Sequence, residues 1–195
     1  LLEHLRADIA AAGIDETGVR SLLDALEREH EVARAVAMEA LSDARYFALL
    51  EQLERAEPKP APGVSATLAE LWWAELGRTR KRFEKLGAST PDDVLHAARI
   101  QVKRARYAAE LASPELGKPG RRFVAAAKEL QDVLGEHQDA CVAEERIRSW
   151  AERDPAVGPV AARLLERERE RRVLARREWP EAWRELDRRG ERARP

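Results

Sequence analysis

A row of basic side chains follows a single histidine in the middle of the chain. His96, Arg99, Lys103 and Arg106 are three, four and three positions apart. At about 3.6 residues per turn, this spacing places all four on one side of a helix. Like charges crowded on one face cost free energy, and a bound polyanion would relieve that cost. The four residues, called the basic stripe below, therefore predict a helical surface that binds an anion.

Apolar residues border the basic stripe on both sides. Leu95 and Val102 lie along one edge of it, and Ile100 and Tyr107 lie along the other. An ordinary amphipathic helix places its bases opposite its apolar face. Bases that lie between apolar residues indicate a face that looks inward, toward a groove. We therefore expect Tyr107 to belong to the core.

The residue types of the stripe suit phosphate. Arginine offers a planar fork that matches phosphate oxygens, and lysine adds a compact charge. His96 would donate a hydrogen bond to the anion, whose charge would raise the pKa of His96. A metal site with Asp92 and Asp93 one turn earlier is a weaker alternative, since no second histidine stands at the next turn. A phosphohistidine role for His96 also stays open.

A second motif follows about two dozen residues later and reads LQDxLGxxxD, from Leu130 to Asp139. Together with the pattern HxxRxxxKRxRY from His96 to Tyr107, it resembles the CHAD family, the conserved histidine α-helical domain. That resemblance implies an all-helical fold of two pseudo-symmetric four-helix repeats. It also implies binding of inorganic polyphosphate by basic residues around a central cavity, often beside a triphosphate-processing domain. No catalytic activity is established for the family's domain itself.

Bases on three predicted helices complete the candidate polyphosphate-binding set. Arg78, Arg82 and Lys85 share one face of the helix that precedes the stripe. If that helix packs antiparallel to the helix of the stripe, its basic face would line the same groove. The alternative is that this face is exposed to solvent. Arg104 lies about a quarter turn from the stripe. Its side chain is equally expected to line the adjacent wall of the groove or to face solvent. Arg34 and Arg45 are lesser candidates. The predicted ligands are Arg78, Arg82, Lys85, His96, Arg99, Lys103, Arg104, Arg106, Arg121, Arg122 and Lys128.

The helix of the second motif carries both bases and acids. Lys128 could contact phosphate, whereas Asp132 and Asp139 would repel it, so we expect these two carboxylates to hold an arginine of the stripe in position. Gly135 inside a helix costs about 1 kcal/mol relative to alanine. A close approach of a neighbouring helix would account for that glycine.

The composition is typical of long helices, with 36% charged and 5% aromatic residues in a chain of 195. No alternating apolar run predicts a strand, so the expected fold class is all-α. Cys141 is the single cysteine, which excludes an internal disulfide and a four-cysteine zinc site and favours a reducing cytoplasm. No apolar stretch approaches the ~20 residues of a membrane span, so no membrane partner is expected.

Sequence signatures of an enzyme are missing. The chain has no Gly-rich phosphate loop, no nucleophile elbow, no HExxH motif and no clustered carboxylates suited to two metals. We therefore expect a non-catalytic protein with no catalytic residue, no metal and no cofactor. The formal net charge of −1 hides an uneven distribution, because bases far outnumber acids between Arg78 and Arg106.

Helical periodicity and turn residues predict six helices. They cover about residues 1–12, 15–56, 66–86, 91–113, 118–153 and 156–188, with Pro180 expected to kink or break the last. The alternating prolines of residues 57–65 predict an extended linker. On the family pattern, residues 66–190 form a C-terminal four-helix repeat, and residues 1–56 form the last two helices of the N-terminal repeat. The first half of that repeat would then precede Leu1, which makes the chain a fragment.

The leading hypothesis is a cytoplasmic polyphosphate-binding domain, associated with polyphosphate granules or with a triphosphate-processing domain in cis or trans. The exposed N-terminal helices would pack on the C-terminal repeat or on a second copy in a homo-oligomer. A helical protein-interaction scaffold is the alternative from another class. A nucleic-acid binder is less favoured, because its aromatic residues should alternate with bases in an open groove. The five tryptophans lie mostly in apolar helical stripes instead.

Overall fold

The computed structural model describes residues 2–56 and 66–195, so the predicted linker at 57–65 lies outside the described residues. Within those ranges the chain forms α-helices and two short 3-10 helices, without a strand, and the all-α prediction is confirmed. No helix in this part of the chain is both long and apolar enough to cross a lipid bilayer. The elements are α1 (Leu2–Ala11), η1 (Glu16–Val19), α2 (Arg20–Ser42), α3 (Ala44–Arg55), α4 (Leu68–Phe83), α5 (Asp92–Leu111), α6 (Ser113–Arg153), η2 (Pro155–Val157) and α7 (Gly158–Arg192).

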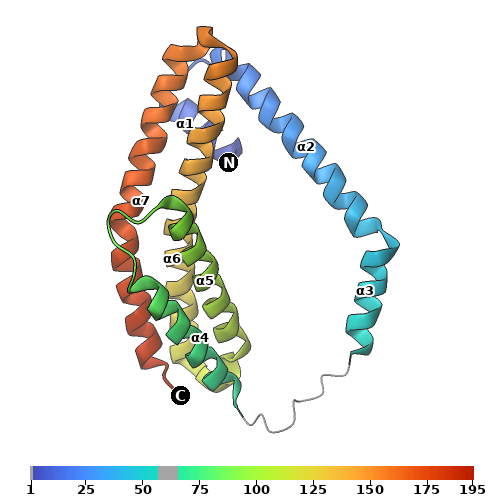
Figure 1. The fold of residues 1–195 in the computed structure, drawn as a ribbon, viewed down its shortest axis with the longest axis vertical. Helices are drawn as coiled ribbons and strands as arrows, with labels where there is room; N and C mark the ends of the chain where they lie inside the picture. The colour runs from blue at the N-terminus through green and yellow to red at the C-terminus, as the bar shows by residue number, and fades with distance from the viewer. Residues whose placement is uncertain (1, 57–65) are drawn as a thin grey trace.

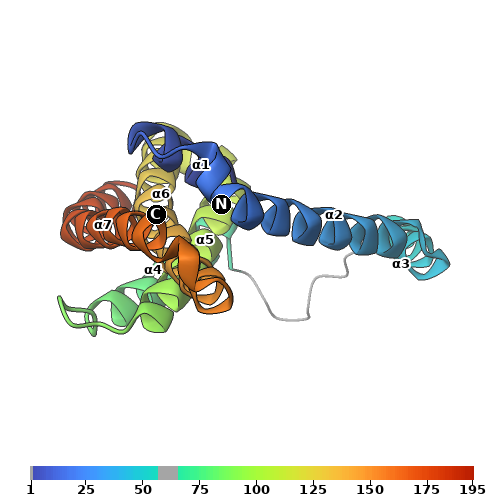
Figure 2. The same cartoon turned by 90° about the horizontal axis from the view of Figure 1, so that it is seen from above.

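A long antiparallel hairpin of α6 and α7 forms the spine of the molecule (Figure 1). At one end of this hairpin α5 packs on α6, and α4 packs on α5. The predicted position of the histidine helix, beside the helices before and after it, is confirmed. At the other end α1 lies against the hairpin, and α2 then leaves the body. Figure 2 shows α2 and α3 projecting sideways from the rest.

The core beneath α4 and α5 combines large aromatic residues with small alanines. Trp72 is fully buried and meets Phe123 of α6 edge to face, with ring centroids 5.0 Å apart. On α5 the buried positions recur at steps of three and four, and three of them are alanines, which lets α5 approach its neighbours closely. These positions are Leu95, Ala98, Val102, Ala105 and Ala109.

A second core joins α1, η1 and the start of α2 to the far end of the α6–α7 hairpin. Leu5, Leu22 and Ile147 are fully or almost fully buried there. The indole Nε1 of Trp150 donates a 2.9 Å hydrogen bond to the Ser21 hydroxyl. The last buried residue of α2 is Leu26, and α3 has none. Apolar burial therefore anchors α2 only over its first two turns, and an ion pair between Glu29 and Arg146 of α6, 3.0 Å long, adds a contact in the third turn.

Two of the predicted helix boundaries need correction. The helix expected over 15–56 is interrupted at Asp43, whose backbone is extended (φ −73°, ψ 145°). The Asp43 carboxylate accepts a 2.7 Å hydrogen bond from the Arg45 amide, so it caps the start of α3 without any glycine or proline. In contrast, α7 continues through Pro180 to Arg192, so the proline does not break it. The expected start near Lys118 corresponds to a kink at Gly117, where φ is +57°.

Trp72 gives a direct test of the α4–α6 core. Replacing Trp72 with alanine should lower the free energy of unfolding by about 3–5 kcal/mol, because it leaves a large cavity at a fully buried position. Trp73→Ala is the matched control, since Trp73 is only partly buried on the same helix. Urea denaturation followed by circular dichroism measures both. Equal losses for the two variants would contradict this view of the core.

Candidate functional site

The basic stripe lies on α5 along its border with α6. Arg99 reaches across that border, and its Nε donates to the Gln131 carbonyl oxygen over 3.4 Å. A Cβ placed on Gly135 would stand 3.6 Å from the Arg99 Nε and Nη2, which is ordinary van der Waals contact, and no α5 backbone atom lies within 4 Å of it. Gly135 therefore faces the Arg99 side chain, and the close helix approach expected there stays a prediction. The LQDxLG motif therefore supports the stripe from the neighbouring helix.

Tyr107 is surrounded by the cations of the stripe, not by the core. Its side chain is 46% exposed, and that of Ile100 is 48% exposed, so the prediction of a core tyrosine is wrong. The Arg106 guanidinium carbon lies 4.8 Å from the centre of the Tyr107 ring, and the Lys103 Nζ lies 5.7 Å from it. Such distances allow cation–π attraction. The outer edge of the stripe faces away from the body because no neighbouring helix covers this side of α5 in the described chain.

His96 is half-buried at the start of the stripe. Its Nδ1 is buried and has no hydrogen-bond partner among the described residues. Of the two aspartates considered as its metal partners, Asp92 contacts His137 instead, with 3.1 Å between the Asp92 Oδ1 and the His137 Nε2. Asp92 is therefore not a carboxylate partner of His96.

Glu75 contacts one arginine of α4 and one of α5. Its Oε2 pairs with the Arg78 Nη1 at 2.5 Å, and its Oε1 lies 3.7 Å from the Arg104 Nε. The Gln101 amide also donates to the Glu75 Oε1 at 2.7 Å. Arg78 and Arg104 thus share one neutralising carboxylate at the α4–α5 border. Arg82, one turn after Arg78, is exposed and has no acidic partner among the described residues.

The remaining predicted ligands divide between two sides of the molecule. Lys85 is exposed just beyond α4, and Lys128 is exposed on α6, three residues before Gln131 and so on the side that faces Arg99. Arg121 is exposed near the start of α6. Arg122 lines a shallow hollow between α6 and α7 together with Glu185, away from α5. The structure therefore groups Lys128 with the stripe and separates Arg122 from it.

The two acids of the second motif do not act as expected. Asp132 and Asp139 are exposed, and neither pairs with an arginine in the described part of the chain. Arg99 is held by a backbone carbonyl instead. A carbonyl neutralises no charge, so the guanidinium of Arg99 keeps its full attraction for an anion.

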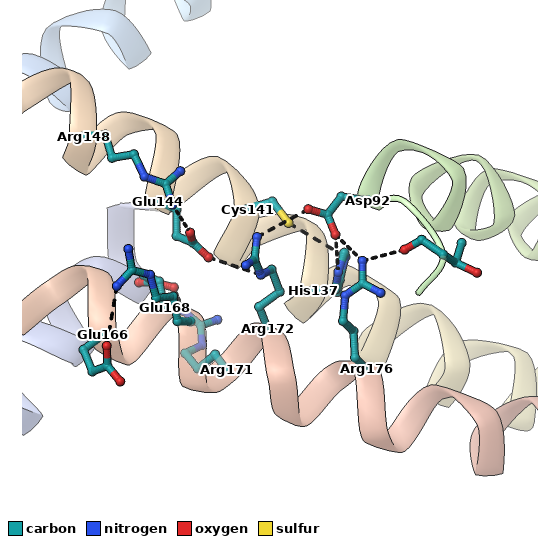
Figure 3. Close-up of polar contacts among 12 residues, drawn as sticks. Asp92, His137, Cys141, Glu144, Arg148, Glu166, Glu168, Arg171, Arg172 and Arg176 are labelled. Atoms are coloured by element: carbon teal, nitrogen blue, oxygen red, sulfur yellow. Dashed lines mark hydrogen bonds and ion pairs between the residues drawn. The ribbon is translucent and has the colours of Figure 1, made fainter. Parts of the chain in front are cut away.

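A seam of arginine–carboxylate pairs, partly buried, joins α7 to α6 and α5 (Figure 3), and Arg171 extends it to Asp8 of α1. Arg171 binds Glu168 at 2.8 Å, Glu136 at 2.7 Å and Asp8 at 3.2 Å. The Arg172 Nε lies 3.3 Å from Glu144, which is 99% buried. None of the motifs described above predicts this seam. The alternating glutamates and arginines from Leu165 to Arg172 are the only signal that could have indicated it.

One end of the seam contains Asp92, His137 and Cys141. Arg172 and Arg176 both bind Asp92, the first at 3.4 Å, and Arg176 also donates to the Thr90 carbonyl at 2.7 Å. Burial alone would raise the pKa of Asp92, but the hydrogen bond and charge of Arg176 outweigh it and hold that pKa below 3.8. Asp92 therefore stays ionised and fixes the start of α5 to α7.

His137 is neutral in this environment. Burial lowers the pKa of His137 below 6.5, although the Asp92 charge acts in the opposite direction. The neutral ring can donate its Nε2 proton to Asp92, and its Nδ1 then faces the Cys141 sulfur at 4.0 Å. Burial also raises the pKa of the Cys141 thiol to about 11, so this thiol keeps its proton at neutral pH.

The same three residues could offer a metal one ligand atom each, all within 4.8 Å of one another. Their chemistry argues against a cation. Two guanidinium groups already compensate Asp92, and a protonated thiol is a poor ligand. The cluster is better explained as a cross-link between α5, α6 and α7 that sets the position of the basic stripe.

The comparisons with known proteins agree with the motifs of the stripe. The family model of the CHAD domain matches residues 1–148. The uncharacterized proteins MT2285 and Rv2226, from Mycobacterium tuberculosis strains CDC 1551 and H37Rv, are each 27% identical over 135 residues. Those residues are 65% of this chain and 25% of theirs, so the chain spans about a quarter of the length of these curated relatives. No solved structure matches.

His137 should make stability depend on pH. Because its folded pKa lies below the unfolded value of 6.5, the unfolded chain binds more protons in the interval between the two values. The free energy of unfolding of the parent should therefore fall as pH drops through and below 6.5. His137→Gln retains a donor for Asp92 and should flatten that fall. Urea titrations at pH 7.5, 6.5 and 5.5 test this, and parallel curves for both proteins would contradict it.

Glu168 should act in the opposite direction. It is fully buried, its Oε1 has no hydrogen-bond partner among the described residues, and burial raises its pKa to about 7 despite Arg171. A raised folded pKa gives stability that is present below the unfolded value of 4.5 and is lost as pH rises toward 7. Glu168→Gln should therefore gain stability relative to the parent between pH 5 and pH 8. The same urea titrations measure the difference in the free energy of unfolding between variant and parent. If the variant becomes less stable relative to the parent from pH 5 to pH 8, the raised pKa of Glu168 is refuted.

Proposed function

This chain belongs to the CHAD domain family, and from the charges of α4, α5 and α6 we propose that it binds inorganic polyphosphate. The proposal rests on a difference between basic residues that are paired with carboxylates and basic residues that are not. The arginines Arg171, Arg172 and Arg176 of α7 are all bound to buried or half-buried carboxylates. Arg99 and Lys103 of the stripe have no carboxylate partner among the described residues. Positive charge that the protein does not neutralise is available to an anion.

The bound chain would follow the α5–α6 border. Arg99, Lys103 and Arg106 would contact successive phosphates, with Lys128 and His96 at the sides. Arg106 has the weaker claim of the three, since Glu110 lies 3.5 Å from it and partly compensates its charge. Arg78 and Arg104 would have to exchange Glu75 for phosphate before they contribute. Each contact is to a repeating, sequence-free backbone, so affinity should depend on charge and fall steeply with salt.

We propose further that binding is not accompanied by catalysis. The stripe itself consists of bases that hold an anion, and two carboxylates that contact bases of α4 and α5 among the described residues, Glu75 and Glu110, are each occupied by arginines. A domain of this kind would serve to recruit or retain polyphosphate. A triphosphate-processing domain, in cis or in trans, would be a suitable neighbour.

The triple variant Arg99→Glu, Lys103→Glu, Arg106→Glu tests the site. A single substitution should weaken binding by at most about 1.5–3 kcal/mol, whereas the triple variant should abolish polyphosphate binding at physiological salt. Isothermal titration with polyphosphate of defined length measures the affinity, and circular dichroism checks that the helical content is unchanged.

A matched control separates the site from a general charge effect. Arg169→Glu, Arg177→Glu, Arg184→Glu makes the same change in net charge at exposed positions of α7. This control should bind polyphosphate nearly as well as the parent. A folded stripe variant with parental affinity would refute the assigned site. Equal losses in both triple variants would reduce the interaction to a non-specific charge effect, and preference for single-stranded nucleic acid at equal charge would favour the alternative ligand.

A further inference from the structure

Glu75 of α4 is a nearly buried carboxylate that contacts two of the predicted phosphate ligands. Its side chain is 11% exposed, whereas the side chains of Arg78 and Arg104 are 70% and 69% exposed. The Gln101 amide of α5 also donates to the Glu75 Oε1 at 2.7 Å. Donors from two helices thus converge on one anion at the α4–α5 border. This arrangement is that of an anion site whose occupant is a side chain of the protein itself.

The α4–α5 border is distinct from the α5–α6 border that the stripe follows. Arg99 reaches a carbonyl oxygen of α6, whereas Arg104 reaches Glu75 of α4. Five positions apart, these two arginines lie about 140° from each other around the helix. The exposed side chains of Ile100 and Tyr107 stand between them. A polyphosphate chain bound to the stripe therefore has a second set of bases within the same domain, on the other side of α5.

We propose that Glu75 is an internal competitor for phosphate at the α4–α5 border, where it withholds Arg78 and Arg104 from a bound polyphosphate chain. This inference rests on the proposed function, since it concerns further contacts to the same ligand. An arginine uses the same N–H donors for a carboxylate and for a phosphate. Donors that Glu75 leaves free also attract an anion less, because its negative charge stands beside them and repels phosphate. If phosphate displaces it, the nearly buried Glu75 loses a charged partner, which costs free energy.

This competition determines how much affinity a polyphosphate gains from its length. A short chain fits on the stripe alone and does not need the α4–α5 border. A chain long enough to reach both borders presents its further phosphates to Arg78 and Arg104 at a high effective concentration. Those phosphates must still displace Glu75. Glu75 therefore weakens the binding of long chains more than that of short ones, and it acts as a determinant of chain-length preference.

The variant Glu75→Gln tests the proposal, because the amide keeps the shape of the side chain and removes its charge. Isothermal titration at physiological salt should show long polyphosphate bound about fivefold more tightly, since two exposed arginines are released. Affinity for triphosphate should change by less than about twofold. The slope of log affinity against log salt for the long chain should steepen by about one to two. Glu75→Met, of similar volume and without charge, is a second variant that should show the same gain.

Two controls separate competition from a general charge effect. Glu170→Gln removes the same charge at an exposed position of α7 and should change both affinities by less than about twofold. The triple variant Glu75→Gln, Arg78→Gln, Arg104→Gln removes the released arginines and should bind long polyphosphate no more tightly than the parent. Circular dichroism checks that every variant keeps its helical content.

Four results would each overturn the proposal. They are parental affinity for long polyphosphate in folded Glu75 variants, an equal gain for triphosphate, an equal gain in Glu170→Gln, and a triple variant that keeps the gain. Any of these leaves the proposed function intact, because the parent still binds polyphosphate through the stripe. A parent that does not bind polyphosphate refutes the proposed function, and the role of Glu75 falls with it.

Discussion

Burying charge without leaving it unpaired is the constraint on which this structure depends. Glu144 and Glu168 are almost completely removed from water, and an isolated carboxylate in such a place would be prohibitively costly. The α7 arginines compensate them, and breaking such a pair by removing one partner typically costs about 3–5 kcal/mol. Because Arg172 and Arg176 also bind Asp92, the same seam fixes where α5 begins.

The seam also determines which bases remain available. The chain has 35 lysines and arginines against 36 aspartates and glutamates, so its overall charge indicates no preference for anions. The fold pairs Arg171, Arg172 and Arg176 of α7 with carboxylates and leaves Arg99 and Lys103 of α5 without carboxylate partners in the described chain. A partner responds to the local field and not to the net charge. Which bases remain available to an anion therefore depends on which of them the helix packing pairs.

Local pattern was enough to predict most of the helices and the placing of the four stripe residues on one helix, because each rests on spacing along the chain. It was not enough to orient the outer face of α5. Tyr107 and Ile100 have the spacing of core residues, yet they are exposed, because burial requires a neighbouring element and none of the described elements covers that side of α5. The contact of Asp92 with His137 joins residues far apart in sequence and depends on three helices packing correctly. The Asp43 break lacks glycine or proline and depends on one side-chain cap.

The basic stripe and the exposed apolar residues Ile100, Tyr107 and Leu111 share α5 but make different physical demands. A polyphosphate chain can neutralise Arg99 and Lys103, yet its hydrated oxygens cannot remove Ile100 or Leu111 from water. A protein surface can cover those apolar side chains, because burial of apolar area is what drives such association. Tyr107 borders the stripe, with the Arg106 and Lys103 cations within cation–π distance of its ring. The exposed charges and the exposed apolar side chains of α5 therefore pose separate physical demands, which no single kind of contact satisfies.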